Sequence, residues 1–319
     1  MIVVAGEALI DLVPAPLTTT SESASPLPQL LPQRGGGPYN VAVALGRLGS
    51  PTSFCSRVST DAFGAALLSG LRDAGVDTEL VQRGSEPTTL AVADVGSDGS
   101  AGYGFYTEGT ADRLFALPPA LPEGATALSV GTCSLVLEPG ASAYEALLRR
   151  EFANGVFTAL DPNIRPGLIA DADAYRKRFL AWLPHVALLK LSIEDALWLA
   201  DLGPDGDDLD THLTAWLEYG SAAIVLTRGG DGLSVWSRGA GQVSVPGTKV
   251  TVVDTIGAGD TVNAALLHRL REIDALSHAA VAGLDAEVWR DVLGFAARAA
   301  ALTCSRSGAE PPYAWELSA

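Results

Sequence analysis

The chain reads Asp254-Thr255-Ile256-Gly257-Ala258-Gly259-Asp260 just before a run, Thr261 to Leu270, that has the apolar spacing of a helix. A glycine-rich turn that opens a helix leaves backbone N–H groups free at the positive end of the helix dipole, where anionic oxygens bind. A carboxylate at Asp260 can take a proton from a hydroxyl while the amides of Ala258, Gly259 and Asp260 hold a transferring phosphoryl group. Taken alone, the stretch is equally typical of a plain loop with an acidic helix start.

A second glycine-rich turn, Gly35-Gly36-Gly37-Pro38-Tyr39-Asn40, also precedes a predicted helix. Consecutive glycines let another molecule approach the backbone closely, and the Asn40 amide can both donate to and accept from sugar hydroxyls. A hinge with Asn40 as the helix N-cap is the alternative interpretation. The chain contains neither a GxxxxGK[ST] loop nor a GxGxxG after a predicted strand, so these two common nucleotide motifs are absent.

Outward from these turns, short β-branched runs alternate with Ala/Leu-rich helical runs over most of the 319 residues. This alternation predicts an α/β fold with a mostly parallel sheet, helices on both faces and ligands at the carboxyl ends of the strands. The predicted strands are Ile2–Ala5, Thr52–Arg57, Ala127–Gly131, Gly155–Leu160, Val186–Lys190 and Ala223–Thr227. The predicted helices are Asn40–Leu48, Gly64–Ala74, 141–152, 172–182, one from Ile193, 261–271 and 286–303.

Two regions break this alternation. Residues 14–33 are rich in Pro, Ser and Thr, which disfavours a helix, and Thr88–Val95 with Gly102–Tyr106 has the pattern of a β-hairpin. We therefore expect one α/β domain over residues 1–319, with a small β lid formed from residues at about 12–34 and 88–108.

Composition excludes several classes of protein. Hydrophobic residues make up 48% of the chain and charged residues 18%, as in folded globular proteins. A net charge of −16 argues against nucleic acid or an anionic membrane as a main partner. Three widely spaced cysteines favour a reducing cytoplasm over a disulfide framework, and Ile2–Ala5 is interpreted as a buried first strand instead of a signal peptide.

The two turns, taken together and in this order, resemble the paired motifs of the PfkB carbohydrate kinases. The matching residues are Gly36-Gly37-Pro38-Tyr39-Asn40-Val41-Ala42 and Asp254 to Asp260, with Asn263-Ala264-Ala265 on the helix that follows. The resemblance covers nearly the whole chain. It implies a ribokinase-like fold and ATP-dependent phosphorylation of a sugar hydroxyl, with Asp260 as general base and Gly257, Ala258 and Gly259 in the anion hole.

Further segments are similar to the fructokinases of that family. Gly6 to Asp11 resembles their first sugar-binding segment, and Asp161 to Pro166 resembles a segment in which an arginine faces the substrate. The resemblance implies that Asp11, Gly36, Gly37, Asn40 and Arg165 bind the sugar, and Tyr106 is a candidate for packing on it. Asp11 as a polar strand end and Arg165 as a surface arginine remain the alternatives.

The nucleotide and metal residues are also assigned through the resemblance. Those expected near ATP are Lys190, Ser192, Thr227, Gly229, Gly232, Gly257, Gly259 and Ala297. Asp195 is expected near Mg²⁺ through water, although Ser192 and Asp195 replace the family's Asn and Glu and also fit a helix capping box. The loops that hold K⁺ in ribokinase correspond to Asp254, Ile256, Thr303, Arg306 and Gly308.

We therefore expect an ATP-dependent kinase that converts fructose to fructose 6-phosphate and pairs as a homodimer through its lid edges. The alternatives on the same scaffold are 2-keto-3-deoxygluconate kinase, ribokinase and a nucleoside kinase. A sugar-binding regulator that has lost turnover is the alternative from another class; the changed Ser192 and Asp195 favour it, and the intact Asp260 opposes it. A nicotinamide-dependent oxidoreductase is excluded because the dinucleotide fingerprint is absent.

Overall fold

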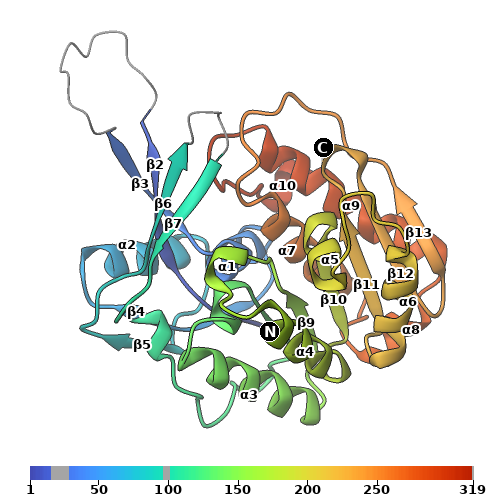
Figure 1. Cartoon of the computed structure of the whole chain (residues 1–319), viewed down its shortest axis with the longest axis horizontal. Helices are drawn as coiled ribbons and strands as arrows, with labels where there is room; N and C mark the ends of the chain where they lie inside the picture. Colours follow the sequence, from blue (N-terminus) through green and yellow to red (C-terminus); the bar gives the residue numbers. More distant parts are fainter. Residues whose placement is uncertain (16–28, 96–100, 318–319) are drawn as a thin grey trace.

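The centre of the molecule is a nine-stranded sheet in the order β13-β12-β11-β10-β9-β8-β1-β4-β5 (Figure 1). The computed structural model describes residues 1–15, 29–95 and 101–317. The strands of this sheet are β1 Ile2–Ala5, β4 Thr52–Ser59, β5 Val81–Gly84, β8 Ala127–Gly131, β9 Phe157–Asp161, β10 Leu188–Ser192, β11 Ala223–Thr227, β12 Leu233–Ser237 and β13 Gly241–Val245. All neighbours from β5 to β11 are parallel, whereas β12 and β13 are antiparallel additions at one edge.

Helices cover both faces of this sheet. They are α1 Gly37–Arg47, α2 Ala62–Asp73, α3 Gly140–Ala153, α4 Ala172–Trp182, α5 Ile193–Ala200, α6 Leu209–Tyr219, α7 Ala258–Glu272, α8 His278–Gly283, α9 Ala286–Cys304 and α10 Ala314–Leu317. Short 3₁₀ turns lie at Asp112–Leu114, Thr132–Leu135, Pro166–Leu168, Leu183–His185 and Gly229–Asp231. None of the helices in the described part of the chain is long and apolar enough to cross a membrane.

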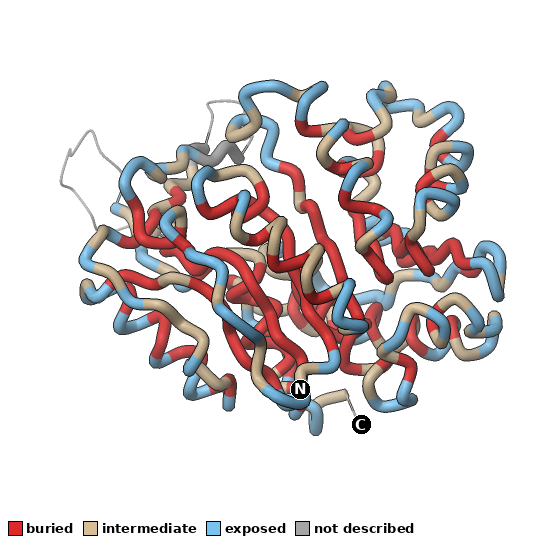
Figure 2. The backbone as a smooth tube through the Cα atoms, turned by 90° about the horizontal axis from the view of Figure 1, so that it is seen from below, coloured by how far each residue is buried: buried red, intermediate tan, exposed pale blue. Residues whose placement is uncertain are grey.

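The core is split by the sheet, as the alternation of side chains along a strand requires. In β1, Ile2 and Val4 pack with α1, α7 and α9, while Val3 and Ala5 pack with α3, α4 and α6 on the other face. Figure 2 shows the buried strands running through the middle of the molecule between these two layers. The pattern that predicted an α/β fold with helices on both faces is thereby confirmed.

A second, four-stranded sheet projects from one side of the body (Figure 1). Its order is β3-β2-β6-β7, with β2 Leu9–Pro14, β3 Leu30–Gly35, β6 Leu90–Val95 and β7 Ala101–Tyr106. Asp11 pairs with Gln33, and Leu90 pairs with Tyr106. The predicted hairpin is therefore present as β6 and β7, and most of the Pro-rich segment lies outside the described residues.

The sequence pattern did not predict β5, β12 and β13. β5 and β13 are four and five residues long, and both contain mostly polar or glycine residues instead of a β-branched run. Such edge strands bury few side chains, so they carry little of the apolar pattern by which strands are recognised in a sequence.

Candidate active site

The glycine turn before α7 has the geometry of an anion site. Gly257 has a φ of 75°, in the left-handed region, and a β-carbon there would lie 2.6 Å from the Ala309 side chain. The N–H of Ala258 donates to the Thr255 carbonyl over 3.3 Å. By contrast, no described residue accepts a hydrogen bond from the N–H of Gly259 or Asp260. Two backbone donors are thus available at the N-terminus of a 15-residue helix.

Asp260 lies where α1 and α7 begin side by side. Its Oδ2 accepts a hydrogen bond of 2.9 Å from Asn40 Nδ2, and both side chains are buried. A β-carbon at Gly37 would lie 2.5 Å from Thr132 and 3.3 Å from Asp260 Oδ1, so only glycine permits this approach of α1. Burial raises the pKa of Asp260 to about 6, although the hydrogen bond from Asn40 and the charge of Lys190 lower it.

A buried ion pair lies behind the turn. Lys190 Nζ, from the middle of β10, is 2.9 Å from Asp161 Oδ2 at the end of β9, and both side chains are 4% exposed. The ammonium also lies 3.0 Å from the place that a β-carbon of Gly259 would occupy. Burial alone lowers the pKa of Lys190, but Asp161 and Asp195 outweigh it and the net pKa is raised. A fixed positive charge therefore stands directly behind the free N–H groups.

A cavity of about 230 Å³ opens in front of Asp260, somewhat smaller than a typical site for a drug-sized ligand. Its lining includes most residues expected to bind a sugar, namely Asp11, Gly36, Gly37, Asn40, Arg165 and Asp260. Burial raises the pKa of Asp11 to about 6, and the charge of Arg165 lowers it. Residues from the small sheet, α1, the β9 loop and α7 thus converge on one space of monosaccharide size.

Tyr106 is placed away from this cavity. Its side chain is 66% exposed, whereas its neighbour Phe105 lines the cavity. Because side chains alternate along β7, only one of the two can face the body.

Ser192 and Asp195 form a helix capping box, which was one of the two interpretations that the sequence allowed. Ser192 Oγ accepts from the N–H of Asp195, and Asp195 Oδ2 accepts from the N–H of Ser192. The other carboxylate oxygen accepts from the N–H of Ile164 over 2.8 Å. Asp195 therefore ties the loop after β9 to the start of α5. In the described part of the chain, no three acidic, cysteine or histidine residues are grouped so that they could hold a metal ion.

The other residues expected near a nucleotide lie beyond Lys190 along the same edge of the sheet. Thr227 is the register partner of Ser192, at the carboxyl ends of β11 and β10. Gly229 and Gly232 follow with φ values of 51° and 100°, and a β-carbon at Gly232 would collide with the Val245 carbonyl. Ala297 is buried in α9.

The residues of the expected K⁺ loops lie next to the glycine turn. Asp254 accepts backbone hydrogen bonds from Ile256 over 3.0 Å and from Gly308 over 2.9 Å, which joins the loop before α7 to the loop after α9. Thr303 is buried, and its carbonyl accepts from the N–H of Arg306.

Sequence reasoning missed Glu7 and the residues that it holds. Glu7 is buried at the cavity wall and accepts hydrogen bonds from the hydroxyls of Thr132 and Ser134 and from the N–H of Ser134 over 3.1 Å. Burial raises its pKa. Thr132 has a φ of 63°, unusual for a β-branched residue, so Glu7 holds a strained turn against Gly37. A charged residue two positions after a fully apolar strand was the available signal.

The whole chain resembles proteins of one family. A family model described as pfkB family carbohydrate kinase matches residues 1–316. A fructokinase from Rhizobium leguminosarum bv. trifolii is 39% identical over 293 residues, which cover 91% of this chain and 86% of that protein. Fructokinase-2 from Zea mays is 31% identical, with coverage of 98% and 90%.

Solved structures agree with the sequence relatives. A fructokinase from Xylella fastidiosa, solved with bound ATP, superposes with a TM-score of 0.86 at 28% identity and covers 99% of this chain and 96% of its own. A fructokinase from Vibrio cholerae O395 in a form with bound fructose, ADP and calcium ion has a TM-score of 0.78 at 25% identity, with coverage of 97% and 94%.

Proposed function

Because the chain belongs to the pfkB family of carbohydrate kinases, we propose that it transfers the γ-phosphoryl group of ATP to D-fructose and releases fructose 6-phosphate. The observation that supports this most directly is the cavity in which Asp260, Asn40 and the free N–H groups of the Gly257 turn meet Asp11 and Arg165. The fructokinase relatives support fructose as the acceptor.

In the proposed reaction, Asp260 accepts the proton of the sugar hydroxyl as that oxygen attacks the γ-phosphorus. The bond between the γ-phosphorus and the bridging oxygen of the β-phosphate breaks, and ADP leaves. The N–H groups of Gly259 and Asp260, with Ala258 beside them, stabilise the charge on the transferring oxygens. Lys190 supplies a positive charge from behind the turn. The Asn40 amide holds the Asp260 carboxylate in one orientation.

The sugar is held between the body and the small sheet. Asp11 and Arg165 bind hydroxyl groups, and Gly36 and Gly37 allow the sugar to approach the backbone. Tyr106 faces away from the cavity, so Phe105 is the aromatic residue that we assign to the sugar in its place.

Nucleotide and cations are proposed on the opposite side of the Gly257 turn. Ser192, Thr227, Gly229 and Gly232 border the nucleotide phosphates, and Ala297 lies near the base. Magnesium bound with the nucleotide would neutralise phosphate charge, and Asp195, whose two oxygens each accept one backbone N–H, would contact it through water. If K⁺ binds, the loops that Asp254 joins before α7 and after α9 would hold it, and the ion would stabilise the Gly257 turn.

Fructose should be the best acceptor in a coupled assay of ADP release over a panel of sugars, because the Asp11 and Arg165 segments match fructokinases. The panel should include ribose, a nucleoside and 2-keto-3-deoxygluconate, whose carboxylate Arg165 could meet. A higher kcat/KM for the sugar acid than for fructose would reassign the substrate. Binding of fructose without ADP release from any sugar would favour a regulator that has lost turnover.

Asn40→Ala should move the acid limb of the pH profile of kcat/KM to higher pH. Asp260 must be ionised to accept a proton, so activity falls as the pH drops through its pKa of about 6. Asn40 lowers that pKa by its hydrogen bond, and its loss raises the pKa. The matched control is Asn163→Gly, which removes another cavity amide, bonded to Arg165 instead, and suits the φ of 42° at that position. If the acid limb of Asn40→Ala stayed at the pH of the parent, the group that titrates in this limb would not be Asp260.

The four-stranded sheet should become more protected from hydrogen exchange when fructose binds. We propose that it acts as a lid, because Leu9, Asp11 and Phe105 face the cavity from this sheet and closure would exclude water from the reaction. Protection should rise in β2, β3, β6 and β7 and stay unchanged in α3 and α4. Unchanged exchange in β6 and β7 at saturating fructose would remove the lid assignment.

The exposed edges of this sheet also fit a homodimer, which analytical sedimentation would detect.

A further inference from the structure

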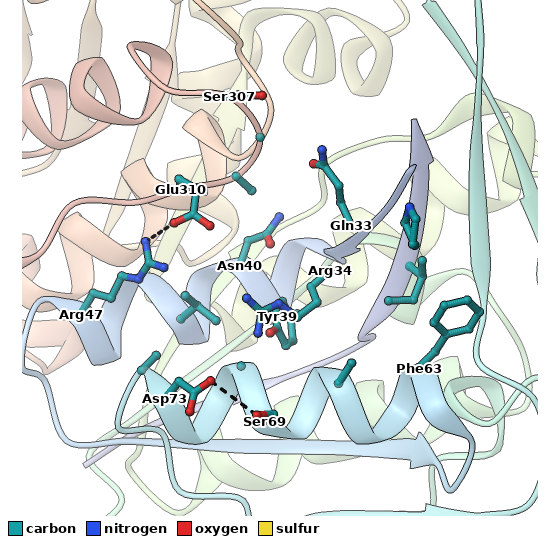
Figure 3. Close-up of a pocket in the computed structure, with 18 of the residues that line it drawn as sticks. Gln33, Arg34, Tyr39, Asn40, Arg47, Phe63, Ser69, Asp73, Ser307 and Glu310 are labelled. Carbon is teal, nitrogen blue, oxygen red and sulfur yellow. Dashed lines mark hydrogen bonds and ion pairs between the residues drawn. The ribbon is translucent and has the colours of Figure 1, made fainter. Parts of the chain in front are cut away.

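A second and larger cavity lies between the four-stranded sheet and the body (Figure 3). Its volume is about 640 Å³, against about 230 Å³ for the cavity at Asp260. Its walls come from strands β2 and β3 with the adjoining helix α1, from helix α2, and from the segment 307–313 near the other end of the chain. Nothing in the proposed phosphoryl transfer uses this space.

Two polar groups converge in this cavity without partners. The guanidinium of Arg34 and the phenol of Tyr39 both lie against Gly70 in α2, where a β-carbon would collide with each of them. Within residues 1–15, 29–95 and 101–317, neither group has a hydrogen-bond or ion-pair partner. Tyr39 is buried and Arg34 is exposed, and the absence of a side chain at Gly70 in α2 leaves room for both groups.

The other charged side chains of the cavity, Arg47, Glu310 and Asp73, have hydrogen-bond partners. Arg47 is bound to Glu310 over 2.6 Å and to the Pro311 carbonyl over 2.8 Å, which fastens the segment 307–313 to α1 (Figure 3). Asp73 accepts a long bond of 3.4 Å from Ser69. The cavity thus offers one unpaired guanidinium with a phenol beside it, and a carboxylate with acceptor capacity across from them.

The cavity also adjoins the groups around Asp260. Asn40 lines both cavities, and its Nδ2 holds the Asp260 carboxylate. Gly308 donates to Asp254, and Ala309 packs against Gly257. A ligand in the second cavity would therefore touch one residue that orients Asp260 and one loop that supports the anion turn.

We propose that this cavity is an effector site for a phosphate-bearing sugar. A guanidinium with an adjacent hydroxyl binds phosphate oxygens, and the Asp73 carboxylate accepts hydrogen bonds from sugar hydroxyls. The bound ligand joins β3 to α1, α2 and the segment 307–313. Because that link restrains the sheet above Asp260, occupancy slows turnover without displacing the acceptor sugar.

Calorimetric titration of the full chain with glucose 6-phosphate tests the site, with inorganic phosphate as a second arm. Because Arg34→Met removes one charge-assisted contact with the phosphate, it should raise the Kd about tenfold or more. Gly70→Ala should do the same by displacing Arg34 and Tyr39. The matched controls, Arg72→Met on the same helix and Gly294→Ala within α9, should bind like the parent, since a β-carbon at Gly294 meets only the end of the Arg298 side chain at 3.7 Å.

Turnover gives the second readout. Glucose 6-phosphate should lower kcat at least about threefold in the parent and leave kcat unchanged in Arg34→Met, whose basal kcat should equal that of the parent. Absence of binding, equal Kd values for parent and Arg34→Met, or displacement of the probe by saturating acceptor sugar would each overturn the site. If inorganic phosphate bound as tightly as glucose 6-phosphate, the sugar part of the ligand would contribute nothing, and the proposal of a phosphate-bearing sugar would be wrong. The binding arm does not require fructose as substrate, so its outcome is independent of the proposed function.

Discussion

Asp260→Asn should lower kcat by about 10²–10⁴-fold and leave the binding of ATP and fructose close to normal, since this is the usual contribution of a positioned general base. The amide keeps an oxygen that can accept the Asn40 hydrogen bond, so the geometry of the helix N-termini should persist. What is lost is the capacity to take a proton. Single-turnover phosphorylation measures this step, and equilibrium titration with each ligand confirms that binding is retained.

The matched control for this variant is Asp285→Asn. Asp285 is the N-cap of α9 and accepts hydrogen bonds from Glu287 and Val288, so it is also an acid at a helix start. Asparagine is an equally good N-cap, and turnover should not change. Near-normal turnover in Asp260→Asn would remove Asp260 from the mechanism.

Lys190→Met should destabilise the fold by about 3–5 kcal/mol, because it leaves the buried Asp161 carboxylate without its partner. The second oxygen of Asp161 is buried and has no hydrogen-bond partner within the described residues, so nothing else there compensates the charge. Chemical denaturation at neutral pH measures the loss as a shift of the midpoint. The same variant should lose turnover, since the charge behind the Gly257 turn is absent.

The double variant Asp161→Asn with Lys190→Met separates the two effects. Removing both charges should recover most of the stability but not the turnover.

The pH dependence of stability provides an independent check. Burial already raises the pKa of Asp161 to about 6, and the loss of Lys190 raises it further. Lys190→Met should therefore gain stability as the pH falls through that pKa, because the folded state then binds a proton more tightly than the unfolded state. A free energy of unfolding of Lys190→Met within about 1 kcal/mol of the parent at neutral pH would contradict the assignment.

The sequence predicted the parts of the site that depend on local geometry. The Gly257 turn and the Gly36–Gly37 turn each have a conformation or a close approach that only glycine allows, and this requirement is visible in the residues themselves. The places of β1, β4 and β8 to β11 along the chain also followed from local periodicity.

Features set by distant pairing could not be predicted in the same way. Whether Phe105 or Tyr106 faces the cavity depends on the register of β7 against β6 and of β6 against β2, which no short segment encodes. Glu7 gains its role from Thr132 and Ser134, more than 120 residues away in the chain. The cavity at Arg34 needs α2 and the segment after α9 to be in place together.

The order of the large sheet also bears on how the chain matures during synthesis. From β8 to β13 the strands lie in the order in which the ribosome delivers them, so the sheet can grow outward one strand at a time. The helix that carries Asp260 comes only after β13, and it returns to pack beside α1 at the start of the chain. A nascent chain or a nonsense fragment that stops before Ala258 thus contains all nine strands but lacks Asp260 and the α7 and α9 side chains that cover one face of the sheet, so the catalyst is completed last.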